Sequence, residues 1–266
     1  MQLQAPLVLE LLLAGCGAGL LAGLLGIGGA MVMVPVLTFV LTRQGMPADY
    51  VVKTAVATSL ATICFTSLSS VRAHHQRGAV RWDIVRVLAP GIVLGSLGGA
   101  QVAVALPAKA LGILFACFVA FSATQMLLDR KPRAGRTVPG RLATFGVGIL
   151  IGLLSSLVGA GGAFISVPFM LWCNVRMHDA VGTSAALGFP IALAGSVGYA
   201  WAGLQLPQMP PGSLGYLYLP GLLVIAAASI TLAPVGARIA HGMDMRPLKR
   251  LFAVFLYGIS VYFLLR

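Results

Sequence analysis

The sequence predicts an all-α polytopic membrane protein built from two inverted-topology repeats of five membrane segments each. Of its 266 residues, 59% are hydrophobic and only 9% are charged, whereas soluble domains average roughly 25% charged residues. Apolar runs close to the ~20 residues needed to cross a hydrocarbon core recur along the chain. A glycine-centred stretch also occurs twice, as LLGIGGAMVMVP at 24–35 and as LVGAGGAFISVP at 157–168, which indicates an internal repeat.

The predicted segments fall into two halves joined by a basic linker. Repeat 1 covers 1–128, with segments at about 6–25, 28–42, 54–71, 84–106 and 110–128. The linker DRKPRAGRTVPGR covers 129–141, and its proline, glycine and charge are typical of a boundary. Repeat 2 covers 142–266, with segments at about 142–157, 161–173, 180–202, 215–235 and 251–265. A second match, AVATS at 55–59 with AVGTS at 180–184, extends the duplication beyond the glycines.

The positions of Lys and Arg choose between two topologies. If the long apolar runs 6–42 and 142–173 each enter the membrane and return to the same side, the basic residues lie inside except Arg43, Lys53, Lys109 and Arg266. If each run crosses once, giving eight spans, the basic residues divide nearly evenly. Because Lys and Arg are enriched in cytoplasmic loops, we expect ten segments with both termini outside. The same rule explains the net charge of +12 without nucleic-acid binding.

Each GxGG motif is expected to join two half-helices, in a short broken or re-entrant hairpin near the middle of the membrane. The ten residues at 163–172 reach about 15 Å, half of the hydrocarbon thickness. A half-helix that begins there directs unpaired N–H groups and the positive end of its dipole into the protein, which favours an anion. The predicted substrate-binding residues are therefore Gly28, Gly29, Ala30, Gly161, Gly162 and Ala163. The alternative is a glycine motif that only packs helices.

Two Thr-Ser pairs and three prolines complete the candidate site. Thr58-Ser59 and Thr183-Ser184 lie near the starts of equivalent segments, and their hydroxyls can donate to an anion. The alternative is a hydrogen bond to carbonyls of their own helix. Proline kinks helices, so the predicted hinges are Pro35, Pro168 and Pro190, of which the last has no counterpart in the first half.

The residues do not indicate an enzyme. No catalytic triad, zinc-ligand spacing or Walker loop is present, so we expect no cofactor and no metal site. The four cysteines lie singly inside apolar runs and resemble packing residues.

The paired motifs resemble the two signature blocks of the sulfite exporter TauE/SafE family. The resemblance rests on GLLGIGGAMVMVPVL and SLVGAGGAFISVPF, followed by AVATS and AVGTSAALGFPIA, and it covers nearly the whole chain. It implies a multi-pass permease of the bacterial inner membrane for sulfite, sulfonates or other sulfur-containing organic anions, usually in export. The residues of this chain that match the family blocks position by position, and that the resemblance therefore implies as site residues, are Gly28, Gly29, Thr58, Ser59, Gly161, Gly162, Thr183 and Ser184.

The function predicted is a secondary transporter that exports a small sulfur-containing oxyanion, such as sulfite or a short organosulfonate. Alternating access around a midplane site is the expected mechanism. The expected partners are the anionic substrate, the lipid bilayer and a coupling ion, either proton or sodium. A passive anion channel and a permease for another small organic anion are the alternatives.

Overall fold

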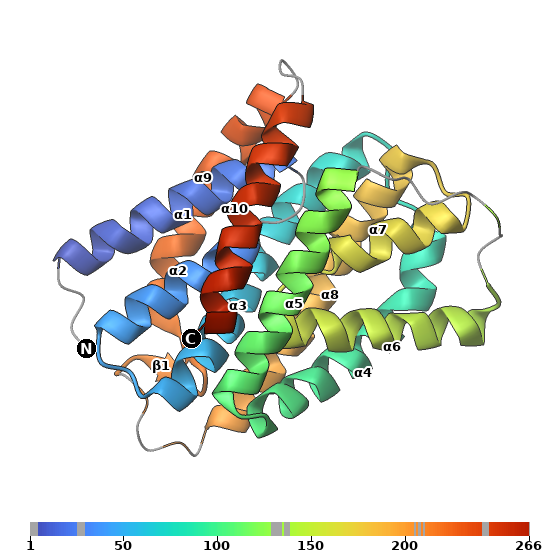
Figure 1. Cartoon of the computed structure of the whole chain (residues 1–266). Helices are drawn as coiled ribbons and strands as arrows, with labels where there is room; N and C mark the ends of the chain where they lie inside the picture. Colours follow the sequence, from blue (N-terminus) through green and yellow to red (C-terminus); the bar gives the residue numbers. More distant parts are fainter. Residues whose placement is uncertain are drawn as a thin grey trace.

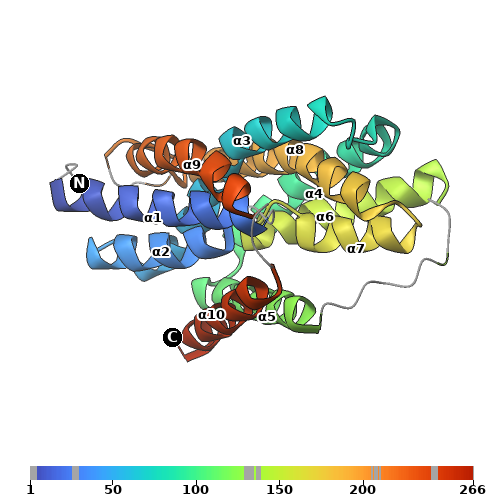
Figure 2. The same cartoon turned by 90° about the horizontal axis from the view of Figure 1, so that it is seen from above.

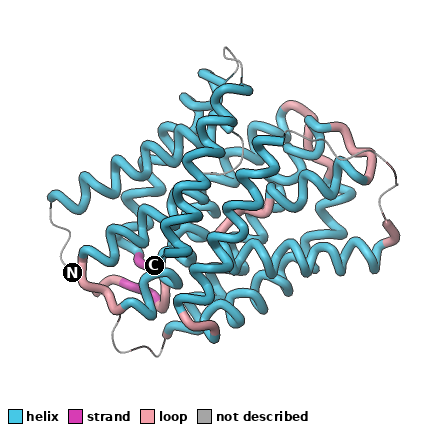
Figure 3. The backbone as a smooth tube through the Cα atoms, in the orientation of Figure 1, coloured by secondary structure: helices cyan, strands magenta, loops and turns pink. Residues whose placement is uncertain are grey.

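The computed structural model describes residues 5–25, 30–128, 135, 139–204, 206, 209, 211–240 and 245–265. Its first half contains α1 (Ala5–Leu25), α2 (Ala30–Arg43), α3 (Ala48–Gln76), α4 (Trp82–Ala105) and α5 (Ala108–Leu128). Its second half contains α6 (Arg141–Val158), α7 (Ala163–Trp172), α8 (Met177–Gly203), α9 (Leu219–Ala240) and α10 (Met245–Leu265). A two-stranded hairpin, β1 (Ser213–Leu214) and β2 (Leu217–Tyr218), precedes α9 (Figures 1 and 3).

Among the described residues, five helices are long and apolar enough to cross a membrane, namely α3, α4, α5, α6 and α8. The described parts of α1, α2, α7, α9 and α10 are apolar over shorter lengths. The prediction of a polytopic α-helical membrane protein is confirmed, and the helices lie at the positions of the predicted segments.

Several helices begin or end a few residues from the predicted bounds, and the starts of α3 and α9 show why. Helix α3 begins at Ala48 rather than near 54, because Pro47 precedes its first turn and Asp49 complements the positive end of its dipole. Lys53 therefore lies within the helix, where its ammonium group donates to the Val104 carbonyl at 2.7 Å. Helix α9 begins at Leu219 rather than near 215, because the hairpin occupies the preceding residues.

Helices α3 and α8 form the buried centre of the bundle. Their most apolar windows are 72% and 67% buried, against 39–44% for α4, α5 and α6. They pack against each other, and each also contacts a short helix of its own half, α2 or α7. The two Thr-Ser pairs lie on these two helices, so the fold places the predicted hydroxyls in its interior.

Contacts between two helices recur between the two helices at the equivalent positions of the opposite halves of the chain. Helix α4 packs along α6 as α1 packs along α9, and α2 contacts α3 as α7 contacts α8. Helices at equivalent positions, α3 with α8 and α5 with α10, contact each other. Figure 2 shows α1 and α2 on one side of the molecule and α6 and α7 on the other, so the two helix pairs approach the middle from opposite directions.

Both of the closest helix pairs depend on glycine. Gly91 and Gly95 of α4 lie against the carbonyl oxygens of Phe145 and Ile149 in α6. In the other pair, a Cβ atom on Gly19 of α1 would lie 2.7 Å from the Ser229 carbonyl oxygen of α9. A side chain at any of these glycines would separate the helices, since small residues permit such close approach.

The connections between helices gather at two ends of the bundle. Residues 43–48, 105–108 and the hairpin lie at one end, at the lower left of Figure 1, and 76–82 and 172–177 lie at the other. The second end carries most of the described arginines, which are Arg72, Arg77, Arg81, Arg86, Arg141 and Arg176.

Candidate functional site

The second glycine turn, Gly159–Gly162, interrupts the helix between α6 and α7. Gly159 ends α6 with φ of 73°, and Gly162 precedes α7 with φ of 77°, both in the left-handed region that favours glycine. The amides of Gly159 and Ala160 both donate to the Ser155 carbonyl, which closes the end of α6. Two left-handed glycines within four residues let the chain reverse direction in a short distance.

The start of α7 presents backbone donors that the described residues leave without acceptors. The Gly162 carbonyl accepts from Ile165 and Ser166, but no described acceptor bonds the amides of Gly161, Gly162, Ala163 or Phe164. Gly162 has no side chain that could cap the helix. The N-terminus of α7 therefore retains the unpaired N–H groups and positive dipole end that stabilise an anion.

The Ser155 hydroxyl lies beside this helix terminus. Its side chain is fully buried, and its oxygen has no hydrogen-bond partner among the described residues. The oxygen lies 3.1 Å from the position that a Cβ atom on Gly162 would take. A buried hydroxyl without a partner is destabilising, so this one is available to a ligand. Sequence reasoning missed Ser155, although the first half has Ala22 at the equivalent position, a difference that could have drawn attention to it.

Helices from both halves surround the second glycine turn. The Ser59 hydroxyl of α3 donates to the Gly159 carbonyl at 3.4 Å. A Cβ atom on Gly159 would lie 3.1 Å from Val34, in the second turn of α2, so α2 lies against the start of the second glycine turn. On the other side, the Ser184 hydroxyl of α8 and the Ser166 hydroxyl of α7 are 2.7 Å apart. The turn therefore lies where the two halves meet.

The two threonines of the Thr-Ser pairs make equivalent contacts across the halves. Thr58 of α3 accepts the backbone N–H of Tyr218, directly before α9, at 3.1 Å. Thr183 of α8 accepts the backbone N–H of Arg81, directly before α4, at 3.0 Å. Both threonines are fully buried. The alternative, a hydrogen bond to a carbonyl of their own helix, does not describe these two contacts. Each threonine hydroxyl instead accepts a backbone N–H from the other half of the chain.

The hairpin before α9 closes one end of this interior. Tyr216 and Tyr218 are buried, and the Tyr216 ring contacts those of Tyr50 and Tyr199, with centroids 6.2 and 6.3 Å apart. Gly215 turns the hairpin with φ of 56° directly against the Ala200 carbonyl. Burial raises the pKa of the Tyr216 and Tyr218 phenols, and repulsion between the Tyr216 and Tyr50 phenolates adds to the rise at Tyr216. Both phenols are therefore neutral near pH 7.

The remaining predicted site residues divide into two groups. Gly28 and Gly29 lie outside the described residues, and Ala30 is the first residue of α2. Pro35, Pro168 and Pro190 lie inside α2, α7 and α8, and Pro190 does not end its helix. No group of three or more His, Cys, Asp or Glu side chains gathers as metal ligands in the described part of the chain.

Comparison with known proteins identifies the family. The model of the family described as sulfite exporter TauE/SafE matches residues 11–263. A probable membrane transporter protein of Haemophilus influenzae is 36% identical, covering 97% of this chain and 98% of its own length. The probable membrane transporter protein YdhB of Bacillus subtilis is 29% identical, covering 90% and 91%. No solved structure matches the chain significantly. The chain belongs to the sulfite exporter TauE/SafE family, whose members are membrane transporters.

Proposed function

We propose that this protein is a secondary transporter that exports a small sulfur-containing oxyanion, sulfite or a short organosulfonate. The observation that carries the proposal is the fully buried Ser155 hydroxyl, without a described partner, beside the uncapped N-terminus of α7. Unpaired backbone amides and a hydroxyl are the donors that bind an oxyanion without a buried cation. The family name supports sulfite as the first substrate to test.

The two halves act as inverted repeats in this proposal, with the substrate near the middle of the membrane. The exchange of helix contacts between the halves supports the repeats, because α4–α6 and α1–α9 are equivalent pairs. The arginine-rich end faces the cytoplasm, which places the start of α1 and the end of α10 outside the bacterial inner membrane. An inside-negative potential then favours anion export by about 2.3 kcal/mol per charge per 100 mV, with proton or sodium as a further coupling ion.

The two threonine contacts support an alternating-access mechanism. Thr58 holds the hairpin at one end of the bundle, and Thr183 holds the connection before α4 at the other. Release of one contact at a time would open the central site to one side of the membrane while the other side stays closed. Pro35, Pro168 and Pro190 are the proposed hinges, because each lies inside a helix that lines the site.

Counterflow in proteoliposomes tests this function. Purified protein is reconstituted in vesicles loaded with unlabelled sulfite, and the uptake of labelled sulfite is measured with taurine, sulfoacetate, sulfate and chloride as competitors. A transporter gives a transient overshoot that sulfite or a sulfonate abolishes and chloride does not. Equilibration without overshoot would replace the transporter with a passive channel. If only an unrelated organic anion produces the overshoot, the substrate is not a sulfur-containing oxyanion.

A further inference from the structure

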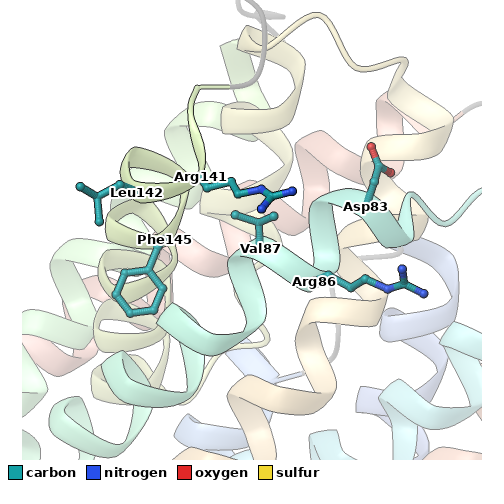
Figure 4. Close-up of a pocket in the computed structure, with 6 residues that line it drawn as sticks. All are labelled: Asp83, Arg86, Val87, Arg141, Leu142 and Phe145. Carbon is teal, nitrogen blue, oxygen red and sulfur yellow. The ribbon is translucent and has the colours of Figure 1, made fainter.

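A hollow of about 730 Å³ lies between the N-terminal ends of α4 and α6. Figure 4 shows its lining, which consists of Asp83, Arg86, Val87, Arg141, Leu142 and Phe145. The hollow begins where the close glycine contact of the two helices ends, because Gly91 lies against the carbonyl of Phe145. It lies at the arginine-rich end of the bundle, away from the second glycine turn.

The charge of this hollow is positive. Arg86 and Arg141 are exposed, and neither guanidinium has an ion-pair or hydrogen-bond partner among the described residues. Asp83 is engaged by Arg81 in two hydrogen bonds of 2.9 and 2.7 Å, so its negative charge is already balanced. In Figure 4 both unpaired arginine side chains extend from their helices toward the same side of the view. The positive dipole ends of α4 and α6 add to the same field.

Apolar side chains continue from the hollow along the same two helices. Leu142 at its edge is 86% exposed, and Leu94 and Leu150 further along α4 and α6 are more than half exposed. In a membrane protein these side chains contact acyl chains. A free anion would contact only the arginines, whereas a lipid contacts the arginines with its headgroup and the apolar surface with its acyl chains.

We propose that this hollow binds an anionic phospholipid, whose phosphate lies between the guanidinium groups of Arg86 and Arg141 and whose acyl chains run along α4 and α6. Guanidinium groups match phosphate oxygens in geometry and charge. Basic pockets at the interfacial ends of transmembrane helices suit such headgroups. The lipid joins two helix ends that otherwise repel each other through their like charges.

Native mass spectrometry of the full-length protein in detergent tests this proposal. Delipidated protein is titrated with phosphatidylglycerol, with zwitterionic phosphatidylcholine and with inorganic phosphate. We expect phosphatidylglycerol to bind about 30-fold more tightly than phosphatidylcholine, because each of the two arginines contributes about 1 kcal/mol toward an anionic lipid. The variant Arg86→Gln/Arg141→Gln should lose this preference. The control Arg72→Gln/Arg77→Gln removes the same charge at the same end of the bundle and should keep it.

Several results would overturn the proposal. One is an unchanged preference in Arg86→Gln/Arg141→Gln, and another is an equal loss in the control, which would indicate a general electrostatic effect. Displacement of the lipid by inorganic phosphate at equal concentration would assign the hollow to a free anion. If the glutamine variant does not fold, Arg86→Lys/Arg141→Lys replaces it. That variant keeps the charges and should retain part of the preference, whereas binding as tight as the wild type would exclude a role for the guanidinium geometry.

Discussion

The two glycine motifs share a sequence pattern but differ in the hydroxyl residues around them. The second turn is preceded by Ser155 and Ser156 and followed by Ser166, whereas the first half has Ala22, Gly23 and Met33 at these positions. In the part of the chain that the structure describes, the Ser155 hydroxyl has no hydrogen-bond partner and Ser166 contacts Ser184, while Met33 is buried among apolar side chains. Hydroxyl groups therefore surround the second glycine motif, whereas small or apolar residues occupy the equivalent positions of the first half, and the proposed anion site uses only the second motif.

The largest effect is expected from Gly162→Ala. The new Cβ atom would meet the Ile191 side chain in a backbone conformation that alanine adopts only with strain, at a combined cost of about 2–4 kcal/mol. Sulfite counterflow should be abolished in protein that still elutes as a monodisperse peak. Gly140→Ala is the control, because its Cβ atom meets no other atom. Normal counterflow in Gly162→Ala would remove the second glycine turn from the site.

The next largest effect, on the apparent affinity for sulfite, is expected when the Ser155 hydroxyl is removed or moved to the equivalent position of the first half. A hydrogen bond to a charged group contributes about 1.5–3 kcal/mol, so Ser155→Ala should weaken the apparent affinity for sulfite by about 10- to 150-fold. Ser156→Ala should change it less than about twofold, because the Ser156 hydroxyl bonds its own helix at the Leu153 carbonyl. If Ala22→Ser restores binding in the Ser155→Ala protein, the two halves are interchangeable and the proposed asymmetry is wrong.

Thr58→Val and Thr183→Val compare the two ends of the bundle. Each leaves a backbone N–H without its acceptor, that of Tyr218 or of Arg81, which costs about 1–3 kcal/mol. Both variants should lower the midpoint of thermal unfolding by similar amounts, whereas Thr231→Val, which removes only bonds within α9, should not. A loss of stability in one variant alone would show that the two contacts are not equivalent.

The smallest effect is expected from Pro190→Ala. Helix α8 is continuous through Pro190, so the substitution leaves its neighbours in place. Loss of a hinge should slow sulfite exchange about threefold at unchanged apparent affinity. Weaker affinity, as expected for Ser155→Ala, would instead assign Pro190 to the binding site.

The positions of most helices could be predicted from hydropathy, because polar loop residues separate the apolar segments from one another. The predicted start of α3 was wrong because the charge of Lys53 indicated a loop. In the folded protein its ammonium group donates to a carbonyl of α4, which allows Lys53 to lie within the helix. The hairpin escaped prediction because its strands are two residues long and are fixed by contacts from α3 and α8. The Thr-Ser pairs could be found through their repetition. The sequence marks Ser155 only by its difference from Ala22, and its unpaired hydroxyl beside the start of α7 is a property of the folded chain.

The most direct test is the position of the anion itself. Crystals grown with selenite, in which selenium replaces the sulfur of sulfite, would show the ion through its anomalous scattering. One selenium peak is expected beside the Ser155 hydroxyl at the start of α7, and this peak should be lost in Ser155→Ala. A peak elsewhere in the bundle, or an unchanged peak in Ser155→Ala, would contradict the proposed site.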